Sequence, residues 1–346
     1  MTILVTGGAG FIGANFVTDW LRRSSEPVVT LDSLTYAGNP GNLPDHDRHT
    51  LVVGDIADRG LVAQALATHR PRAVLHFAAE SHVDRSITGP SAFIQTNVVG
   101  TFELLEAVRL YLDQGAVGER AAFRFLHVST DEVYGSLPSD APAFTETTAY
   151  APNSPYSASK AASDHLVRSY HHSFGLPVLT TNCSNNYGPY QYPEKLIPVA
   201  IRSALSGAPI PVYGNGTNIR DWLYVADHCS AIRAVLDRGR VGETYNVGGN
   251  NEVANIDLVR MICNLLDEMA PLPSKRSYGE QISFVTDRAG HDFRYAINSS
   301  KITKEVGWQP TEQLASGLRK TVRWYLDHGQ WVTDALKRRD QGRVLA

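Results

Sequence analysis

The chain has 346 residues, 43% of them hydrophobic and 19% charged, which is ordinary for a globular protein. Lys and Arg total 32 against 35 Asp and Glu, a formal net charge of −3, so the basic footprint of a nucleic-acid or anionic-membrane binder is missing. Three widely spaced cysteines, Cys183, Cys229 and Cys263, favour reduced thiols in a cytoplasm over a disulfide framework or zinc site. Met1 leads directly into an apolar strand, which predicts no signal peptide, and no apolar run approaches the ~18 residues of a membrane span.

The first segment predicts a strand at Thr2–Thr6, a glycine loop and a helix. Gly7, Gly10 and Gly13 are each separated by two residues, which allows a tight turn and lets a diphosphate approach backbone N–H groups. Alone, these glycines are equally consistent with a plain turn. A second apolar strand then ends in Asp32, whose carboxylate can accept bonds from both ribose hydroxyls and would repel a 2′-phosphate. The pattern therefore predicts NAD rather than NADP.

Two further strands are predicted at residues 50–53 and 73–77. Asp55 follows the first of them, where it could meet the adenine edge or cap the next helix; the spacing leaves both open. Small residues from Ala78 to Ser81 follow the second and would let a cofactor lie close to the backbone.

A fifth strand, 125–128, is followed by Ser129, Thr130, Asp131 and Glu132. Open α/β sheets bind ligands beyond the carboxyl ends of their strands, so these polar residues lie where a substrate is expected. Taken alone, the two carboxyls would more commonly be helix caps than catalytic groups.

Tyr156 and Lys160 form a Tyr-x3-Lys pair, which one helical turn places on the same face. The ammonium can lower the pKa of the phenol, which makes Tyr156 a general base for oxidising an alcohol. Alone, the pair would be a surface i,i+4 contact; the upstream dinucleotide loop and Thr130 favour catalysis. The adjacent Asp131 and Glu132 add a second acid–base pair.

Two long helical runs, Phe93–Leu112 and Tyr156–Phe174, carry apolar residues on more than one face. They could pair across a dimer axis as a four-helix bundle, or pack only against the sheet. The neighbouring His171 and His172 lack a completing ligand at suitable spacing, so we predict helix-surface or interface residues and no metal site.

Alternating strands and helices predict a Rossmann-type, doubly wound parallel α/β sheet, with a sixth strand at 177–181. Beyond residue ~186 the alternation weakens, which predicts a smaller, partly discontinuous substrate lobe. The expected division is 1–185 for the NAD-binding domain, with returning segments near 218–250, then 186–330 for the substrate lobe and 331–346 for a solvated tail.

Together these residues resemble the extended short-chain dehydrogenase/reductase family over nearly the whole chain. Four motifs, Ser129–Gly135, Asn185–Pro189, Glu194–Pro198 and Asp287–His291, are similar to those of its dTDP-glucose 4,6-dehydratase group. Sugar-nucleotide epimerases share the glycine loop and the Tyr-x3-Lys pair but usually lack the Asp-Glu pair. Ala289 stands where many relatives have Pro, a minor loop departure.

The resemblance implies conversion of dTDP-glucose to dTDP-4-keto-6-deoxyglucose by a homodimer, for deoxysugar synthesis. Tyr156, helped by Lys160, the nicotinamide charge and Thr130, would deprotonate the C4 hydroxyl; Glu132 would then remove the C5 proton and Asp131 protonate the leaving C6 hydroxyl. The alternative is an NAD-dependent nucleotide-sugar 4-epimerase, which makes no net loss of water. A non-catalytic NAD-binding regulator would be expected to lack Tyr156 or Lys160. The choice of dTDP over another nucleotide rests on the resemblance alone.

The residues expected to contact the cofactor, in part through the resemblance, are Gly7, Gly10, Phe11, Ile12, Gly13, Asp32, Leu34, Thr35, Asp55, Ile56, Ala78, Ala79, Ser81, Thr96, Tyr156 and Lys160. Those expected by resemblance to contact the nucleotide sugar are Ser81, Thr130, Asn186, Lys195, Leu196, Pro211, Tyr213, Arg220, Asn255, Arg288 and His291. Arg and Lys suit a diphosphate, and Asn suits a pyrimidine or sugar edge.

Overall fold

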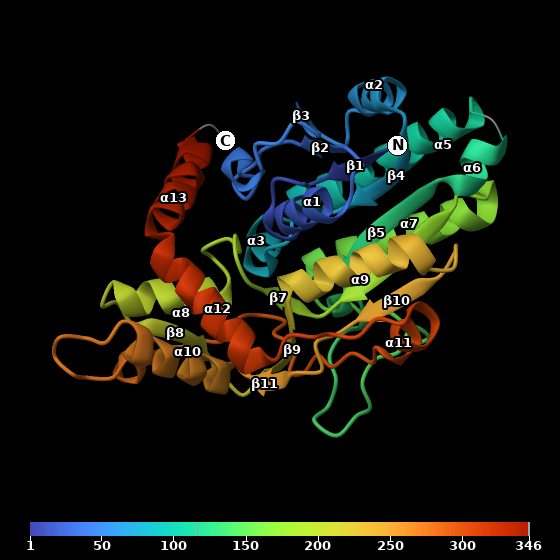
Figure 1. Ribbon diagram of the computed structural model, residues 1–346. Coiled ribbons are helices and arrows are strands. Elements are labelled where there is room, and N and C mark those ends of the chain that lie inside the picture. The colour runs from blue at the N-terminus through green and yellow to red at the C-terminus, as the bar shows by residue number, and fades with distance from the viewer. Residues whose placement is uncertain (116, 345–346) are drawn as a thin grey trace.

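The computed structural model describes residues 1–115 and 117–344. Its main feature is a seven-stranded sheet in the order β10-β6-β5-β4-β1-β2-β3, with every neighbouring pair parallel (Figure 1). The predicted Rossmann-type fold is therefore confirmed. The strands of this sheet are β1 (Thr2–Thr6), β2 (Val28–Asp32), β3 (His49–Val53), β4 (Pro71–His76), β5 (Arg124–Thr130), β6 (Val178–Cys183) and β10 (Thr244–Val247).

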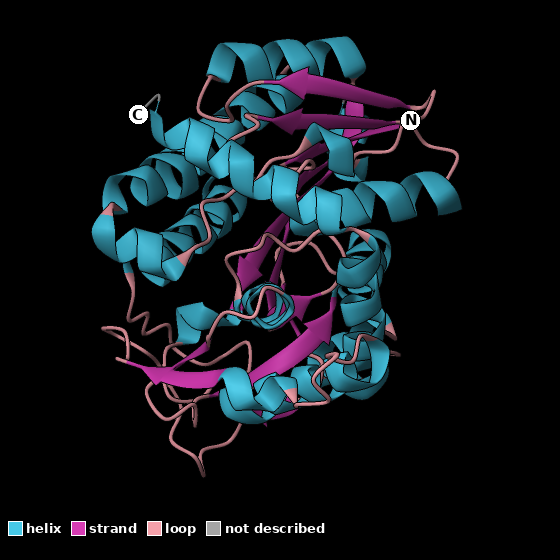
Figure 2. Ribbon diagram, turned by 90° about the vertical axis from the view of Figure 1, so that its left-hand side faces the viewer, coloured by secondary structure: helices cyan, strands magenta, loops and turns pink. Residues whose placement is uncertain are grey.

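Helices cover both faces of this sheet, which is why strands β2, β5 and β6 are buried along nearly their whole length (Figure 2). On one side α1 packs against α9, and on the other α5 packs between α2 and α7. The α-helices are α1 (Phe11–Arg23), α2 (Arg59–His69), α3 (Val83–Thr88), α4 (Pro90–Phe93), α5 (Thr101–Asp113), α6 (Val117–Ala122), α7 (Pro155–Phe174), α8 (Leu196–Leu205), α9 (Val225–Arg238), α10 (Asn255–Met269), α11 (Ser300–Val306), α12 (Leu314–Asp327) and α13 (Gly329–Val344).

The run Phe93–Leu112, which was predicted to be one helix, is less regular. A π-helical segment, η2 (Ile94–Gly100), joins α4 to α5. The wider turn carries Asn97, whose amide donates to the Glu80 carbonyl oxygen and whose Oδ1 accepts from the Glu80 N–H at 2.8 Å. Apolar periodicity cannot reveal such an insertion, because it depends on a contact with the loop after β4.

A second, smaller lobe carries two small sheets, β11-β9-β7 and β12-β8. Its own apolar core joins α8, α10 and α12. The returning strand expected near Tyr245 is β10, which extends the main sheet beside β6. The domain boundaries stay a prediction. The remaining strands and short helices are η1 (Pro40–Asn42), η3 (Asp131–Tyr134), β7 (Asn185–Tyr187), β8 (Ile210–Tyr213), β9 (Ile219–Tyr224), β11 (Glu252–Ala254), η4 (Tyr278–Gln281) and β12 (Ile282–Val285).

The segment expected as a tail is helical as α13, up to the last described residue, and it runs from the smaller lobe towards the N-terminal half of the chain (Figure 1). The Trp331 indole N–H donates to Asn42 Oδ1 at 2.7 Å, and the Tyr192 hydroxyl donates to the Ala335 carbonyl oxygen at 3.2 Å. This helix therefore links the C-terminal part of the chain to the loop after β2.

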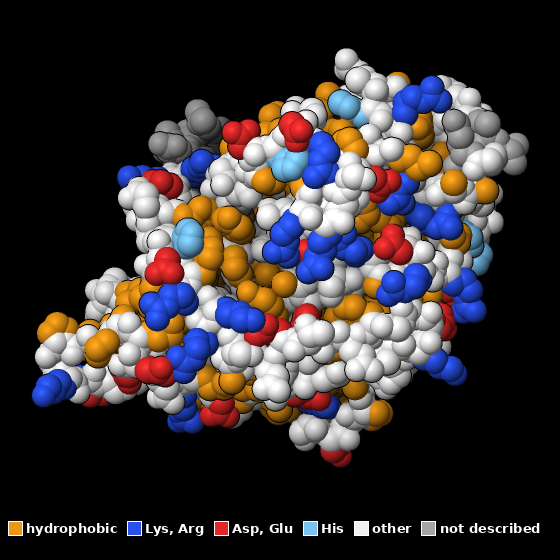
Figure 3. Space-filling model, in the orientation of Figure 1, with side chains coloured by type: hydrophobic (Ala, Val, Ile, Leu, Met, Phe, Trp, Pro, Cys, Tyr) orange, Lys and Arg blue, Asp and Glu red, His pale blue; other side chains and the backbone are white. Residues whose placement is uncertain are grey.

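None of the helices in the described part of the chain is both long and apolar enough to cross a membrane. Acidic and basic side chains are interspersed over the face in Figure 3, with apolar side chains in the hollow between the lobes. This mixed surface agrees with the small net charge of −3.

The contact between α12 and β7 leaves no room for a larger residue at Gly317. A Cβ there would lie 2.2 Å from the Tyr187 hydroxyl oxygen, whereas a Cβ at Gly329 in α13 meets nothing within 4 Å. We predict that Gly317→Ala lowers the free energy of unfolding by ~1–3 kcal/mol, as overpacking does. The matched control, Gly329→Ala, should leave it unchanged or raise it, because Ala favours a helix. Denaturant unfolding measures both, and equal stabilities of the two variants would contradict the packing.

Candidate active site

One cleft at the carboxyl edge of the main sheet is lined by nearly all the residues expected to contact the cofactor. Leu34 does not line it; instead its N–H donates to Asp32 Oδ1 at 2.8 Å. The expected residues that line the cleft are Gly7, Gly10, Phe11, Ile12, Gly13, Asp32, Thr35, Asp55, Ile56, Ala78, Ala79, Ser81, Thr96, Tyr156 and Lys160.

The glycine loop between β1 and α1 is packed so closely that side chains could not be accommodated. Gly7 has a φ of +68°, and a Cβ there would lie 2.6 Å from the Ala78 backbone nitrogen. A Cβ at Gly13 would lie 2.3 Å from the Gly7 carbonyl oxygen. The start of α1 thus presents a bare backbone to the cleft, which is the arrangement that a dinucleotide diphosphate requires.

Asp32 is buried at the end of β2, and its carboxylate organises the same loop. Oδ2 accepts from the Ala9 N–H at 2.9 Å, and burial raises the pKa of the carboxyl despite this bond. Asp55 also lines the cleft, and its Oδ1 accepts from the Ala57 N–H at 2.8 Å. The alternative that Asp55 caps α2 is wrong, because Asp58 holds the cap position and accepts from the Leu61 N–H.

The five expected catalytic residues meet in this cleft. β5 ends at Thr130, whose hydroxyl accepts from the Glu132 N–H at 3.3 Å and so begins the short helix η3. Tyr156 and Lys160 come from the first turns of α7. The Lys160 ammonium donates to the Val128 carbonyl oxygen at 2.9 Å, which ties α7 to β5.

Asp131 and Glu132 differ in their electrostatic surroundings. Burial, and next the charge of Glu132, raise the pKa of Asp131 well above its usual range. Burial also raises the pKa of Glu132, but the cations of Arg288, Lys195 and Arg220 oppose this rise. These directions favour a proton on Asp131 over one on Glu132.

Burial acts strongly on the Tyr156 phenol. Its pKa lies well above the ordinary value because burial, and next the charge of Glu132, disfavour the phenolate. A hydrogen bond with Thr130 acts in the opposite direction but does not overcome burial. The shift towards neutrality was predicted from Lys160 together with the nicotinamide charge, and it stays a prediction.

Four of the expected substrate contacts, Ser81, Thr130, Asn186 and Lys195, line the cleft. The Lys195 ammonium donates to the Ser81 carbonyl oxygen at 2.7 Å, which joins the start of α8 to the loop after β4.

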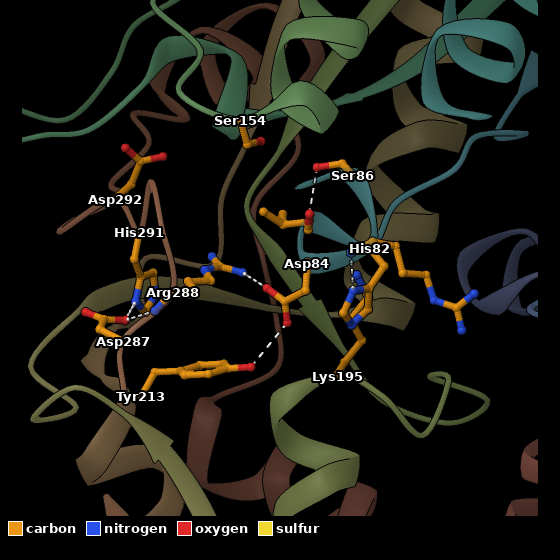
Figure 4. Close-up of polar contacts among 12 residues, drawn as sticks. His82, Asp84, Ser86, Ser154, Lys195, Tyr213, Asp287, Arg288, His291 and Asp292 are labelled. Atoms are coloured by element: carbon orange, nitrogen blue, oxygen red, sulfur yellow. Dashed lines mark hydrogen bonds and ion pairs between the residues drawn. The ribbon is translucent and has the colours of Figure 1, made fainter. Parts of the chain in front are cut away.

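Three more of the expected contacts lie together beside α3 (Figure 4). Asp84 accepts from the Arg288 guanidinium at 3.3 Å and from the Tyr213 hydroxyl at 3.3 Å. His291 Nδ1 contacts Asp287 Oδ1 at 2.6 Å. Asp84 thus connects the first lobe to the second through two residues of the predicted nucleotide-sugar site.

Arg220 is buried next to these residues, with its guanidinium 4.3 Å from the centre of the Tyr295 ring. Leu196, Pro211 and Asn255 are not among the residues that line the cleft: Leu196 begins α8, Pro211 lies in β8 and Asn255 begins α10.

Residue spacing did not identify a second set of cleft residues. The Arg85 guanidinium lies 3.7 Å from the centre of the Tyr36 ring and pairs with Glu194 at 3.0 Å. The Tyr36 and Tyr192 rings are 5.3 Å apart, and Glu80 lines the same cleft. Of these residues only Glu194 belongs to a motif identified in the sequence, Glu194–Pro198.

Among the described residues there is no group of three or more His, Cys, Asp or Glu side chains that could hold a metal ion. Cys183, Cys229 and Cys263 are all buried free thiols, and burial raises the pKa of each of them.

Comparison with known proteins agrees with this geometry. The family model described as GDP-mannose 4,6 dehydratase matches residues 4–321. A dTDP-glucose 4,6-dehydratase of Xanthomonas campestris pv. campestris (strain B100) is 61% identical over 338 residues, which cover 97% of this chain and 96% of that one. A solved dTDP-glucose 4,6-dehydratase from Streptomyces venezuelae, with NAD and dTDP bound, is 45% identical with a TM-score of 0.87, covering 97% of this chain and all of that one.

A more distant structure is that of a Thermus thermophilus UDP-glucose 4-epimerase in complex with NAD. It is 30% identical, with a TM-score of 0.83, and the match covers 95% of this chain and 100% of that one.

The fold and the cleft thus define a dinucleotide-binding protein whose cleft contains a Tyr-x3-Lys pair and an adjacent carboxyl pair. The chain belongs to the GDP-mannose 4,6 dehydratase family, and within it to the group of the dTDP-glucose 4,6-dehydratases. The resemblance that the sequence motifs indicated is confirmed.

Proposed function

We propose that the chain converts dTDP-glucose to dTDP-4-keto-6-deoxyglucose, with NAD held in the cleft between the sheet and the smaller lobe. The observation that carries this proposal is the pair of a buried Asp131 and a half-buried Glu132 in the same cleft as Tyr156 and Lys160. Oxidation alone would need the Tyr-Lys pair and no carboxyls. Elimination of water needs one acid and one base, and the two carboxyls have the surroundings for these two roles.

The residues present fit NAD. The bare backbone at Gly7 and Gly13 would hold the diphosphate, and Asp32 would accept from the adenosine ribose hydroxyls. Tyr156 and Lys160 line the other part of the same cleft, beside the expected sugar position. Bound there, NAD would supply the acceptor for the hydride from the sugar C4 and the donor of the same hydride to C6, so that the cofactor would be recycled in each turnover.

Tyr156 takes the proton of the C4 hydroxyl, and Thr130 orients that hydroxyl. Because burial holds the pKa of Tyr156 high, the phenolate depends on positive charge nearby. The Lys160 ammonium supplies one such charge from the same helix.

Glu132 removes the C5 proton and Asp131 protonates the departing C6 hydroxyl. Glu132 faces the cations of Arg288, Lys195 and Arg220, which favour its charged form, as a base requires. Asp131 has the most strongly raised pKa of the pair and so brings its own proton, as an acid requires.

The epimerase alternative is disfavoured by this pair and by similarity. A 4-epimerase has no use for a carboxylic acid that protonates a leaving hydroxyl. The chain is 61% and 45% identical to the two dTDP-glucose 4,6-dehydratases, against 30% for the UDP-glucose 4-epimerase.

We propose that the nucleotide diphosphate is bound by Lys195, Arg288 and Arg220, and that Asn186 binds the edge of the sugar or the base.

We also expect a cytoplasmic homodimer that pairs α5 and α7. Its support is the row of exposed apolar residues there, which includes Phe102, Leu110 and Phe174 at 37%, 40% and 47% exposure.

The function is tested directly by mixing the pure protein, supplied with NAD, with dTDP-glucose, UDP-glucose and GDP-mannose. We expect a 4-keto product from dTDP-glucose, detected by its absorbance in base. Epimerised sugar without loss of water would support the alternative.

Asp32 predicts a preference for NAD over NADP, because its carboxylate occupies the space that a 2′-phosphate needs. Asp32→Asn removes the charge, so it should narrow the ratio of the two dissociation constants by about tenfold, or ~1.4 kcal/mol. Fluorescence titration measures the dissociation constants for NAD and NADP. A disturbance of the loop at Ala9 would affect both constants alike, so it cancels in their ratio. NADP found in the purified protein would contradict this role.

Tyr156→Phe removes the base but keeps the ring packed in the cleft. We expect kcat to fall ~10²–10⁴-fold, the usual contribution of a general base, while the dissociation constant for dTDP-glucose stays nearly unchanged. Steady-state kinetics and calorimetry separate the two quantities. A variant that keeps more than about a tenth of the wild-type kcat would exclude Tyr156 as the base.

Glu132→Gln and Asp131→Asn preserve shape but remove the C5 base and the C6 acid. Both variants should still form NADH in a single turnover, and then stall at a 4-keto sugar that keeps its C6 hydroxyl. Only Glu132→Gln should block exchange of the C5 proton with deuterium from solvent. Absorbance of NADH together with mass analysis of the quenched sugar measures both steps.

Loss of NADH formation in both variants would place the two carboxyls in the oxidation step or in the fold. Since burial raises both pKa values, the wild-type rate should fall on the acid side as Glu132 gains a proton, and on the alkaline side as Asp131 loses one.

A further inference from the structure

A buried polar cluster lies behind Lys160, on the side away from the expected sugar position. Lys160 and Asp164 are one turn apart on α7, and both are almost completely buried. They reach consecutive residues of β5: the Lys160 ammonium donates to the Val128 carbonyl oxygen at 2.9 Å, and Asp164 Oδ1 lies 3.1 Å from His127 Nε2. The two opposite charges therefore face the same strand from the same side of the helix.

The Asp164 carboxylate is held from a second direction. The Tyr150 hydroxyl donates to Asp164 Oδ2 at 2.9 Å, and it accepts from the Asn182 amide at 3.0 Å. Burial lowers the pKa of His127 well below its usual range, so the ring is neutral and its Nε2–H donates to the carboxylate. Donors from β5 and from the loop before α7 thus fix Asp164 in its charged form.

The ammonium of Lys160 needs such a partner, because burial lowers its pKa and the charge of Asp164 is the largest effect in the opposite direction. Burial raises the pKa of Asp164 to about 6, so it is a carboxylate throughout the neutral and alkaline range. The titratable groups around the pair come from five elements and the loop before α7: His165 on α7, His127 on β5, His76 on β4, Cys183 on β6, Tyr134 on η3 and Tyr150 in the loop.

We propose that Asp164 is a positioning residue that keeps the Lys160 ammonium charged where it lines the cleft with Tyr156. The mechanism above leaves Asp164 unused, and a buried carboxylate is costly without an opposite charge nearby. This inference rests on the proposed function only in so far as Lys160 assists oxidation. Asp164 itself does not touch the substrate.

The first test is the pH dependence of NADH formation in a single turnover by the NAD-loaded Asp164→Asn variant, a step that needs neither Asp131 nor Glu132. Without the counter-charge Lys160 loses its proton at lower pH, so the alkaline limb of this rate should move down by ~1–3 pH units, the usual effect of a nearby opposite charge. The dTDP-glucose concentration that gives half the maximal rate should change little. Asp164→Glu should restore the limb, and the matched control Asp227→Asn, an equally buried carboxyl that holds Thr311, should leave it unmoved.

The second test is a double-mutant cycle on unfolding by denaturant, with saturating NAD. In the wild-type background Asp164→Asn should lower the free energy of unfolding, because it leaves the Lys160 ammonium buried without an opposite charge. In the Lys160→Met background the same substitution should be neutral or stabilising. If Asp164→Asn alone fails to fold, the double variant with Lys160→Met should still fold.

An unmoved alkaline limb with a uniformly lower rate of NADH formation, or an equal loss of stability in both backgrounds, would overturn the proposal. Wild-type protein that forms no 4-keto sugar at any pH would instead contradict the proposed function, and the unfolding cycle would still decide the role of Asp164.

Discussion

Two adjacent carboxyls lie at the end of β5, one buried and one half-buried, and the rest of the site depends on how their charge is divided. Asp131 and Glu132 cannot both ionise cheaply here, because burial and their mutual repulsion raise the pKa of Asp131. The cations of Arg288, Lys195 and Arg220 then decide which carboxyl is charged. Since these cations come from the second lobe, the acid–base pair is complete only when both lobes are in place.

The same dependence on non-local charge governs the oxidation step. Burial that excludes water from the cleft also disfavours the Tyr156 phenolate and the Lys160 ammonium. Asp164, held by His127 and Tyr150, offsets part of that cost from one turn further along the same helix. The catalytic end of the sheet is thus a set of charges that are stabilised by partners from α7, from β5 and from the second lobe.

Local patterns in the sequence were sufficient for the sheet, the glycine loop, Asp32 and the five residues from Thr130 to Lys160, because each depends on spacing within one strand–loop–helix unit. They were not sufficient for the π-helical segment that begins at Ile94, where Asn97 contacts the Glu80 backbone, or for the stacking of Arg85 on Tyr36. The effect of burial on the pKa of Tyr156 could not be predicted either, since burial cannot be read from an i,i+4 pair. The contact of Asp164 with Lys160 could have been predicted from the sequence, because the two residues are four positions apart on one helix.

The central claim is that one sugar molecule is oxidised at C4, loses water and is reduced at C6 without leaving the cleft. The most direct measurement uses a mixture of dTDP-glucose deuterated at C4 and ¹³C-labelled dTDP-glucose without deuterium, with mass analysis of the products. The account predicts that deuterium appears at C6 of the same molecules that carried it at C4, with water lost and no net change in NAD. Deuterium scrambled into the ¹³C-labelled product, or retained at C4 of a sugar that has lost no water, would contradict it.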